Sequence, residues 1–213
     1  MDQDIEIINQ NTRIEKIKNF FLNNFKRIII ILILIILILF GYFILLENKK
    51  NNKSKIAETY NYVIAEYQKD KSNNFQIELI NIINEKDPTY SPLALYFLID
   101  NQIINDVNEI NRLFDLLIEK TKINQEIKNL IIYKKALFNS ENFNENELLN
   151  ILKPIINSES VWKSHSLYLL AEFFYSKNQR EKSKEFYQQI LVLKNANTNI
   201  RLEAEKKLNR DFK

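Results

Sequence analysis

The sequence contains no cysteine, only one glycine and only three prolines among its 213 residues. Without cysteine the chain has no disulfides and no thiolate chemistry, and the redox state of its compartment stays undecided. Folds rich in β-strands, and α/β folds, need glycine and proline in their many turns. The scarcity of both residues therefore predicts an all-α fold.

Residues that carry common chemistry are also scarce. The single glycine is Gly41, so a glycine-rich phosphate-binding loop is excluded. His165 is the only histidine, and without cysteine neither a zinc site nor a Cys–His nucleophile has enough ligands. Glu172, Glu181 and Glu185 lie among lysines, as is typical of solvated helix faces. We therefore expect no enzyme activity, no cofactor, no metal and no small-molecule substrate.

The charge is balanced, with a formal net charge of +3. Residues 1–27 hold five Lys and Arg and four Asp and Glu, which leaves 30 − 5 = 25 basic and 27 − 4 = 23 acidic residues for the rest. Binding to the phosphates of DNA or RNA requires concentrated positive charge. We therefore expect no nucleic-acid partner.

Between positions 28 and 46 the sequence reads IIIILILIILILFGYFILL, without a charged residue. At ~1.5 Å per helical residue, this stretch can cross a hydrocarbon core of ~30 Å. A buried core helix would have an apolar run of about 10–14 residues and a polar stripe, which is absent here. We predict a transmembrane helix at 28–46, in contact with the lipid bilayer. It has no small-residue seam and no charge, which indicates an anchor and not a conducting or signalling helix.

The apolar stretch is longer than the ~7–15 residues of a signal-peptide core, and Glu47-Asn48-Lys49-Lys50 after it offers no small-residue cleavage site. The predicted anchor is therefore uncleaved. Five basic residues precede it, and Lys49, Lys50, Lys53 and Lys55 follow it closely, the first three in a lysine-rich neck. The positive-inside rule is nearly tied and leans only slightly toward a cytoplasmic N-terminus.

We expect the N-terminal segment, 1–27, to be cytoplasmic and partly helical, with an irregular start over residues 1–12. Its apolar residues recur at helical spacing, at Ile14, Ile17, Phe21 and Phe25. A helix with one such apolar face can lie at a membrane surface.

After the neck at 47–53, residues 54–213 repeat apolar side chains at the helical spacing of three and four. The predicted helices pair as 54–70 with 75–86, 91–104 with 107–121, 124–139 with 145–157, and 160–177 with 180–194, and a last helix at 198–210 is a candidate cap. Ser91 before Pro92 predicts a helix start, and Pro154 predicts a kink or a helix end.

Helix pairs that recur at about 34 residues indicate a tetratricopeptide-like α-solenoid of about four pairs. The fourth pair fits the pattern of large, small and aromatic positions with Leu167, Leu170, Ala171, Phe174, Ser183 and Tyr187. The third pair keeps Ala136 at the small position, and the first pair has Val63 there. The usual helix-turn glycine and closing proline are absent.

In this register four tyrosines take equivalent positions at intervals of 36, 37 and 35: Tyr60, Tyr96, Tyr133 and Tyr168. The position lines the concave groove of tetratricopeptide arrays. Tyrosine rings suit peptide capture because they bury area while the hydroxyl stays in water. The candidate peptide-binding groove consists of Tyr60, Tyr67, Tyr96, Tyr133, His165, Tyr168, Glu172 and Tyr175. The alternative is that these rings only pack between neighbouring helices.

This organisation resembles the YfgM-like ancillary SecYEG translocon subunits. The segments that carry the likeness are FKRIIIILILIILILFGYF around the span, the helix start at 90–95, and SVWKSHSLYLLAEFFYSKNQREKSKEFYQQIL at 160–191. The resemblance implies a bacterial inner-membrane protein with a periplasmic helical domain. Its implied partners are Sec translocon subunits, periplasmic chaperones and exported polypeptides.

Three functional hypotheses follow. The first is a membrane-tethered interaction module that binds exported polypeptides or chaperones at the translocon. The second is a structural scaffold of another cell-envelope complex, which binds no client peptide. The third places the helical domain in the cytoplasm as a docking adaptor.

Overall fold

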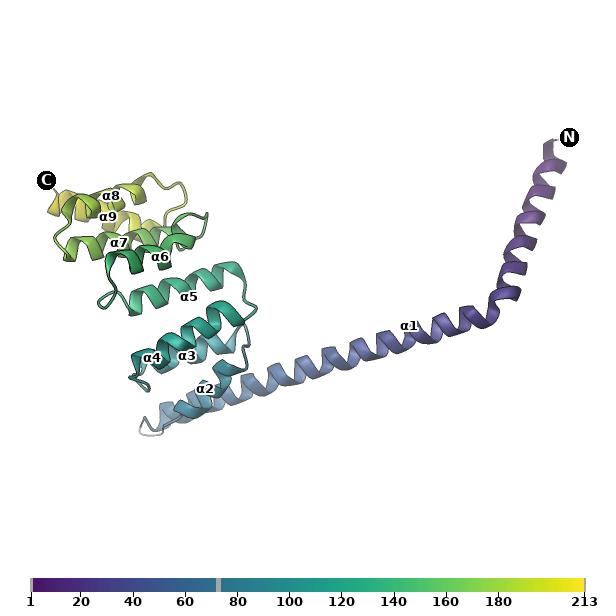
Figure 1. Cartoon of the computed structure of the whole chain (residues 1–213), viewed down its shortest axis with the longest axis horizontal. Coiled ribbons are helices and arrows are strands. Elements are labelled where there is room, and N and C mark those ends of the chain that lie inside the picture. The colour runs from purple at the N-terminus through teal and green to yellow at the C-terminus, as the bar shows by residue number, and fades with distance from the viewer. Residues whose placement is uncertain (1, 72–73, 213) are drawn as a thin grey trace. The chain divides into compact units, whose positions relative to one another are not determined.

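The computed structural model describes residues 2–71 and 74–212, and over these residues it is helical without any strand (Figure 1). The all-α prediction is therefore confirmed. The chain divides into two compact units, Met1–Lys55 and Ile56–Lys213. The division falls inside the first helix, α1 (Asp2–Lys69).

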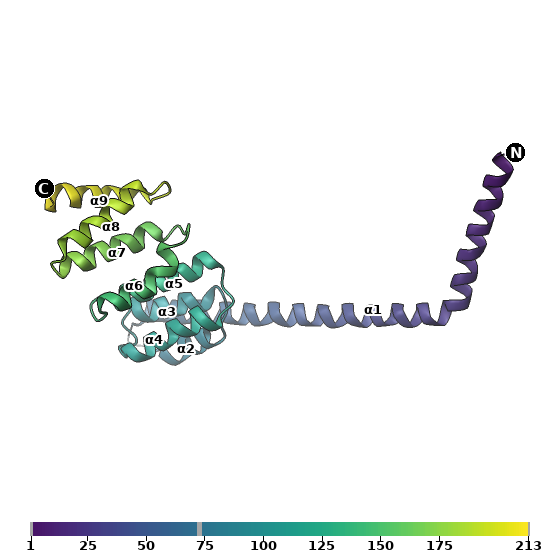
Figure 2. The ribbon, with the colours of Figure 1, turned by 45° about the horizontal axis from the view of Figure 1, so that its top comes forward.

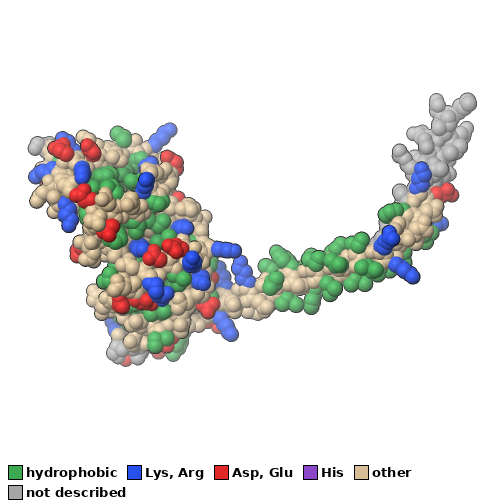
Figure 3. All heavy atoms as spheres, viewed as in Figure 1, with side chains coloured by type: hydrophobic (Ala, Val, Ile, Leu, Met, Phe, Trp, Pro, Cys, Tyr) green, Lys and Arg blue, Asp and Glu red, His purple; other side chains and the backbone are tan. Residues whose placement is uncertain are grey.

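The first unit contains the apolar stretch, and α1 is long and apolar enough there to span a membrane. The large apolar side chains from Ile29 to Leu46 are all exposed, by 41 % or more. A core helix of a soluble protein would instead be mostly buried. Figure 3 shows these side chains as a band along α1 with Lys and Arg side chains beyond both ends.

The first unit is more helical than expected. Helix α1 begins at Asp2, so the irregular start expected over residues 1–12 is not observed, and the neck at 47–53 is helical as well. The side chains of Ile14, Ile17 and Phe21 lie outside the described part of the structure. The apolar face predicted for them therefore stays a prediction.

The second unit consists of the last turns of α1 and eight further α-helices among the described residues. They are α2 (Gln76–Asn84), α3 (Tyr90–Asp100), α4 (Val107–Asp115) with a π-helical turn η1 (Leu116–Lys120), α5 (Gln125–Phe138), α6 (Glu145–Ile156), α7 (Lys163–Ser176), α8 (Arg180–Val192) and α9 (Thr198–Asp211). These bounds agree with the predicted helices to within a few residues. Helices that follow one another in the chain pack together, as α7 with α8 and α8 with α9 (Figure 2).

Asparagine and aspartate form the helix starts of this glycine-poor chain. Asn144 and Glu147 form a reciprocal capping box at the start of α6. The side chains of Asp106, Asn124 and Asn197 accept backbone N–H groups at the starts of α4, α5 and α9. Each such cap stabilises its helix by about 1 kcal/mol. The polar loops between the helices are therefore part of the fold.

Three turns use a left-handed residue that is not glycine. Lys86, Gln102 and Asn178 have φ values of 56°, 53° and 60°, each just after a helix end. Glycine is favoured in this conformation because a Cβ atom costs roughly 1–2 kcal/mol there. The helix turns therefore form without glycine, at some cost in stability.

The capping role predicted for Ser91 is wrong, although the helix starts within one residue of the expected position. Helix α3 begins one residue earlier, and Asp87 Oδ1 accepts the backbone N–H groups of Thr89 and Tyr90 at 2.8 Å each. Ser91 is buried, and its Oγ donates to the carbonyl of Ile82 in α2 at 2.7 Å. Ser91 thus holds α3 against α2 and does not cap α3. Pro154 behaves as expected, since α6 ends two residues after it.

The positions assigned to the repeat pattern are buried. Leu167, Leu170, Ala171, Phe174, Ser183 and Tyr187 are each 2 % exposed or less. At the small position, Val63, Ala136 and Ala171 are completely buried. Ser183 Oγ donates to the carbonyl of Ala171 at 2.8 Å, so α8 lies directly on the backbone of α7 there.

This close approach predicts that Ala171→Leu destabilises the domain by about 1–3 kcal/mol, because the added methyl groups have no space under α8. Urea unfolding of the full chain in detergent, followed by the fluorescence of the single tryptophan Trp162, measures the change. Ala65→Leu is the matched control, since Ala65 is exposed on α1 and its change should stay within about 0.5 kcal/mol. Equal stability of the two variants would contradict the packing.

Candidate functional site

Most of the tyrosines proposed for a groove lie against another aromatic ring. The ring pairs and their centroid separations are Tyr60–Tyr90 (5.7 Å), Tyr67–Phe97 (5.2 Å), Tyr133–Trp162 (5.9 Å), Tyr168–Tyr187 (5.7 Å) and Tyr175–Phe212 (5.7 Å). Tyr96 differs from them. Its ring lies under the ammonium group of Lys134, with 4.4 Å between Nζ and the ring centroid.

A small cavity of about 130 Å³ opens beside Tyr96, between α3 and α5, and we call it the Tyr96 cavity. Its lining residues are Tyr96, Ile99, Asp100, Phe114, Lys134, Leu137 and Phe138. The hydroxyl of Tyr96 is buried and has no hydrogen-bond partner among the described residues. Burial, together with the nearby charge of Asp100, raises the pKa of Tyr96. The hydroxyl therefore stays protonated and is a donor without an acceptor.

A larger cavity of about 430 Å³ opens between the end of α5 and α7, and we call it the Glu172 cavity. Its lining residues are Ser140, Glu141, Leu169, Glu172, Phe173, Ser176 and Lys177. The Nζ atom of Lys177 lies 5.5 Å from the centroid of the Phe173 ring. This cavity combines an apolar floor with charged groups of both signs.

The two cavities occupy equivalent positions on successive helix pairs. Three lining residues of the Tyr96 cavity each precede one of the Glu172 cavity by 35 positions: Lys134 and Leu169, Leu137 and Glu172, and Phe138 and Phe173. The interval is that of the tyrosine row between Tyr133 and Tyr168, where 168 − 133 = 35. Helices α5 and α7 thus present the same side to the helix pair before them.

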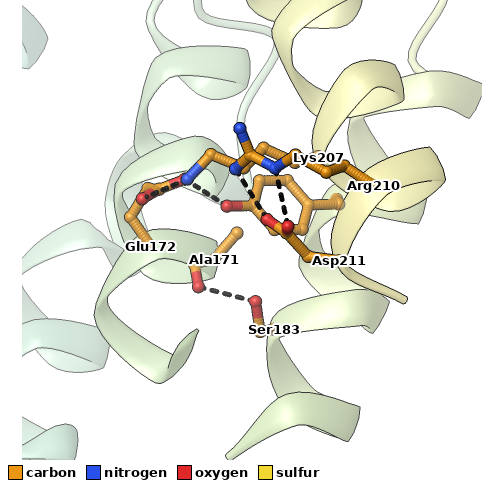
Figure 4. Close-up of polar contacts among 7 residues, drawn as sticks. Ala171, Glu172, Ser183, Lys207, Arg210 and Asp211 are labelled. Atoms are coloured by element: carbon orange, nitrogen blue, oxygen red, sulfur yellow. Dashed lines mark hydrogen bonds and ion pairs between the residues drawn. The ribbon is translucent and has the colours of Figure 1, made fainter. Parts of the chain in front are cut away.

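Glu172 is held by a network that joins three helices. Tyr187 of α8 donates its hydroxyl to Oε1 of Glu172, and Nζ of Lys207 on α9 lies 2.7 Å from the same oxygen (Figure 4). Burial opposes ionisation of Glu172, but the hydrogen bonds from Lys207 and Tyr187 outweigh it and lower the pKa of Glu172. Glu172 is not the solvated helix-face residue that its neighbouring lysines indicated.

The C-terminal end of α9 is fixed by further charged contacts. Arg210 Nε lies 2.7 Å from Oδ1 of Asp211, and Arg180 of α8 donates to the carbonyl of Asp211. The ring of Tyr175 lies between the Arg180 guanidinium, at 5.7 Å, and the Lys207 ammonium, at 5.5 Å. Tyr175 is therefore part of the joint between α7 and α9.

His165 belongs to an aromatic cluster and lines neither cavity. Its ring centroid lies 5.1 Å from that of Trp162 and 6.0 Å from that of Tyr133. Burial lowers the pKa of His165, which keeps the imidazole neutral. Nδ1 is buried without a hydrogen-bond partner in the described part of the chain. The cluster is a packing unit between α5 and the start of α7.

Of the eight residues assigned to the groove from the sequence, Tyr96 and Glu172 line the two cavities. The structure does not gather the other six into either cavity. The residues that the sequence reasoning missed are Lys134, Leu137 and Phe138 and their counterparts on α7, Leu169 and Phe173. The 35-residue interval that relates them is visible in the sequence, but the prediction applied it only to the tyrosine positions.

Among the side chains that the structure describes, no group of three or more His, Asp or Glu is placed to hold a metal ion. Comparison of the chain with protein-family models, curated proteins and solved structures finds no match. The resemblance to YfgM-like translocon subunits therefore stays a prediction from the sequence.

The Glu172 network predicts a specific effect of Glu172→Gln. Because the pKa of Glu172 is lowered in the folded state, its ionised form stabilises the fold above the unfolded pKa of ~4.3, and this stability is lost as the pH falls through the folded pKa. We expect the variant to be less stable by about 1 kcal/mol at neutral pH, with a weaker loss of stability between neutral and acidic pH. Urea unfolding at several pH values measures both effects.

Glu185→Gln is the matched control, because Glu185 is exposed on α8 and carries the same charge. Its stability and pH dependence should equal those of the wild type. An identical response of the two variants would contradict the role of the network.

Proposed function

We propose that the protein is a single-pass membrane protein whose helical domain binds other proteins. The observation that carries this proposal is the pair of cavities at equivalent positions on α5 and α7. Adjacent packed helices have axes about 8–10 Å apart, which an extended polypeptide crosses in about three residues. The spacing of side chains along an extended polypeptide therefore matches the spacing of the two cavities, and a polypeptide is the ligand that fits both at once.

The domain is, in this proposal, a tetratricopeptide-like solenoid of about four helix pairs capped by α9. Three observations support it: the sequential packing of the helices, the completely buried small position at Val63, Ala136 and Ala171, and the hydrogen bond from Ser183 to the carbonyl of Ala171. Each helix pair buries its apolar side against the next pair, as stacked repeats require.

The chemistry of the cavities also suits polypeptide side chains. The Tyr96 cavity is mostly apolar, with the rings of Phe114 and Phe138, and adds the unpartnered Tyr96 hydroxyl and the Lys134 ammonium. Such a mixture takes an apolar side chain while its donors bind a carbonyl or carboxylate oxygen. The Glu172 cavity offers charged groups at its rim, which favour polar side chains.

The proposed location is the bacterial inner membrane, with residues 1–27 in the cytoplasm and the helical domain in the periplasm. There the protein is accessory to the Sec translocon and to periplasmic chaperones, and it binds them or exported polypeptides. This part rests on the sequence resemblance alone. Tethering by the span raises the effective concentration near the channel, so weak binding is sufficient.

A structural scaffold of another envelope complex is the second candidate. The observation that favours it is that five tyrosine rings pack against neighbouring aromatic rings inside the helical domain. This packing is what the alternative to a peptide-binding groove expects. In that case the domain holds one fixed partner and no diverse clients.

Leu137→Asp tests the cavities. Leu137 lines the Tyr96 cavity and is 48 % exposed, so a carboxylate there blocks apolar binding while the fold is retained. We expect most crosslinked partners to be lost in copurification after crosslinking in cells. Leu202→Asp is the matched control, since Leu202 is 49 % exposed on α9 and lines neither cavity.

The proteins recovered from the wild type separate the two candidates. Translocon subunits with diverse exported proteins support the interaction module, whereas one fixed partner that survives Leu137→Asp supports the scaffold. Equal loss in both variants would contradict a role for the Tyr96 cavity.

A reporter fused after Lys213 tests the orientation. We expect alkaline phosphatase at this position to be active, because the enzyme needs an oxidising periplasm, and a fluorescent protein that folds only in the cytoplasm to be dark. The reverse result would place the helical domain in the cytoplasm and leave the docking adaptor.

A further inference from the structure

Three lysines follow the apolar stretch on one side of α1. Lys49, Lys50 and Lys53 are exposed, and at 3.6 residues per turn they lie within an arc of about 100°. In the part of the chain that the structure describes, none of the three forms an ion pair with an acidic side chain. Glu47, the nearest acidic residue, lies outside this arc. The three ammonium groups are therefore available to an external anion.

If the apolar stretch spans a membrane, Lys49 and Lys50 lie at the depth of the lipid headgroups and Lys53 lies just beyond them. Lys49 and Lys53 are three and seven residues beyond Leu46, which corresponds to about 4.5 and 10 Å along the helix. The headgroup region on each side is roughly 5–7.5 Å thick, because a bilayer of ~40–45 Å has a core of ~30 Å. Flexible lysine side chains reach the lipid phosphates from both positions.

Tyr42 extends the same side of the helix into the membrane. It is seven residues before Lys49, which returns it to nearly the same side, and its ring is 57 % exposed. Tyrosine favours the boundary between hydrocarbon and headgroups, where its ring is buried and its hydroxyl donates a hydrogen bond. At one turn, ~6 Å, on the hydrocarbon side of Leu46, and with a side chain that tilts toward the N-terminus, Tyr42 lies inside the core and does not reach the lipid phosphates.

The two ends of the span differ in charge. Residues 47–55 contain four lysines and one glutamate, for a net charge of 4 − 1 = +3. Residues 19–27 contain only Lys26 and Arg27, for a net charge of +2. The C-terminal end also has its lysines on one side of the helix, together with a tyrosine.

We propose that Lys49, Lys50 and Lys53 form a binding site for an anionic phospholipid in the leaflet at the C-terminal end of the span. The three ammonium groups bind the lipid phosphate. A zwitterionic lipid is selected against because its phosphate is already balanced by its own cation. This inference rests on the membrane span of the proposed function.

Electron paramagnetic resonance with spin-labelled lipids tests the site. The full chain is reconstituted in vesicles of three parts phosphatidylcholine to one part phosphatidylglycerol, and the preference for each labelled lipid at the protein surface is measured. We expect the wild type to prefer phosphatidylglycerol by about fivefold, the factor that corresponds to ~1 kcal/mol for a lysine near an anionic surface. The variant Lys49→Gln, Lys50→Gln, Lys53→Gln should lose the preference.

The matched control removes the same charge from the helical domain, by Lys120→Gln, Lys122→Gln and Lys153→Gln at exposed positions. It should keep the preference, and so should Tyr42→Phe, because the Tyr42 hydroxyl lies below the headgroups. No preference in the wild type, an unchanged preference in the Lys49, Lys50, Lys53 variant, or an equal loss in the control would overturn the site.

Two further measurements identify the ligand and separate the proposals. Loss of the preference on adding inorganic phosphate would show that the lysines bind any phosphate and not a lipid. Flotation of the vesicles at alkaline pH tests the span itself. A chain that leaves the vesicles contradicts both the proposed function and the site, whereas a chain that stays in them without lipid preference contradicts the site alone.

Discussion

The close approach of α8 to α7 at Ala171 is the contact on which the C-terminal half of the domain depends. A methyl group at Ala171 and the hydrogen bond from Ser183 let the second helix lie on the backbone of the first. Tyr187, one turn further along α8, then packs beneath Tyr168 and reaches Glu172. Glu172 in turn receives Lys207 and so fixes α9. A larger side chain at this point would separate all of these groups.

The turns between the helices form without glycine, because the single glycine, Gly41, lies in α1. Asparagine and aspartate side chains satisfy the free N–H groups at helix starts, and Lys86, Gln102 and Asn178 accept the left-handed conformation at helix ends. A composition rich in asparagine and lysine is therefore compatible with short, defined turns. The caps at helix starts stabilise the fold, and the left-handed residues at helix ends destabilise it. Because the two effects offset each other, the helix pairs keep a regular interval without the usual glycine and proline.

The helices, the long apolar stretch of α1 and the burial of the repeat-pattern positions were predictable because the spacing of apolar residues is a local signal. The features that could not be predicted depend on tertiary contacts between residues that are far apart in the sequence. Asp and Ser are both residue types that cap helices, but here Asp87 accepts the backbone N–H groups at the start of α3, whereas Ser91 lies inside the helix and donates to the carbonyl of Ile82. Glu172 was read as solvated because its partner Lys207 is 35 residues away. The cavities were missed for the same reason, since residues such as Leu137 line them only after α3, α5 and α7 have packed together.

A stack of helix pairs has no natural end, because each pair exposes an apolar side that matches the side it has just covered. Helix α9 covers that side of the last pair with Ala204, Ile200 and Leu208, and its other side carries Glu203, Glu205 and Lys206 in water. The ion pair of Lys207 with Glu172 and the hydrogen bond from Arg180 to the carbonyl of Asp211 hold it in place. In the repeat organisation proposed above, α9 therefore ends the stack, because its outer side presents charged residues in place of an apolar surface that a further helix pair could cover.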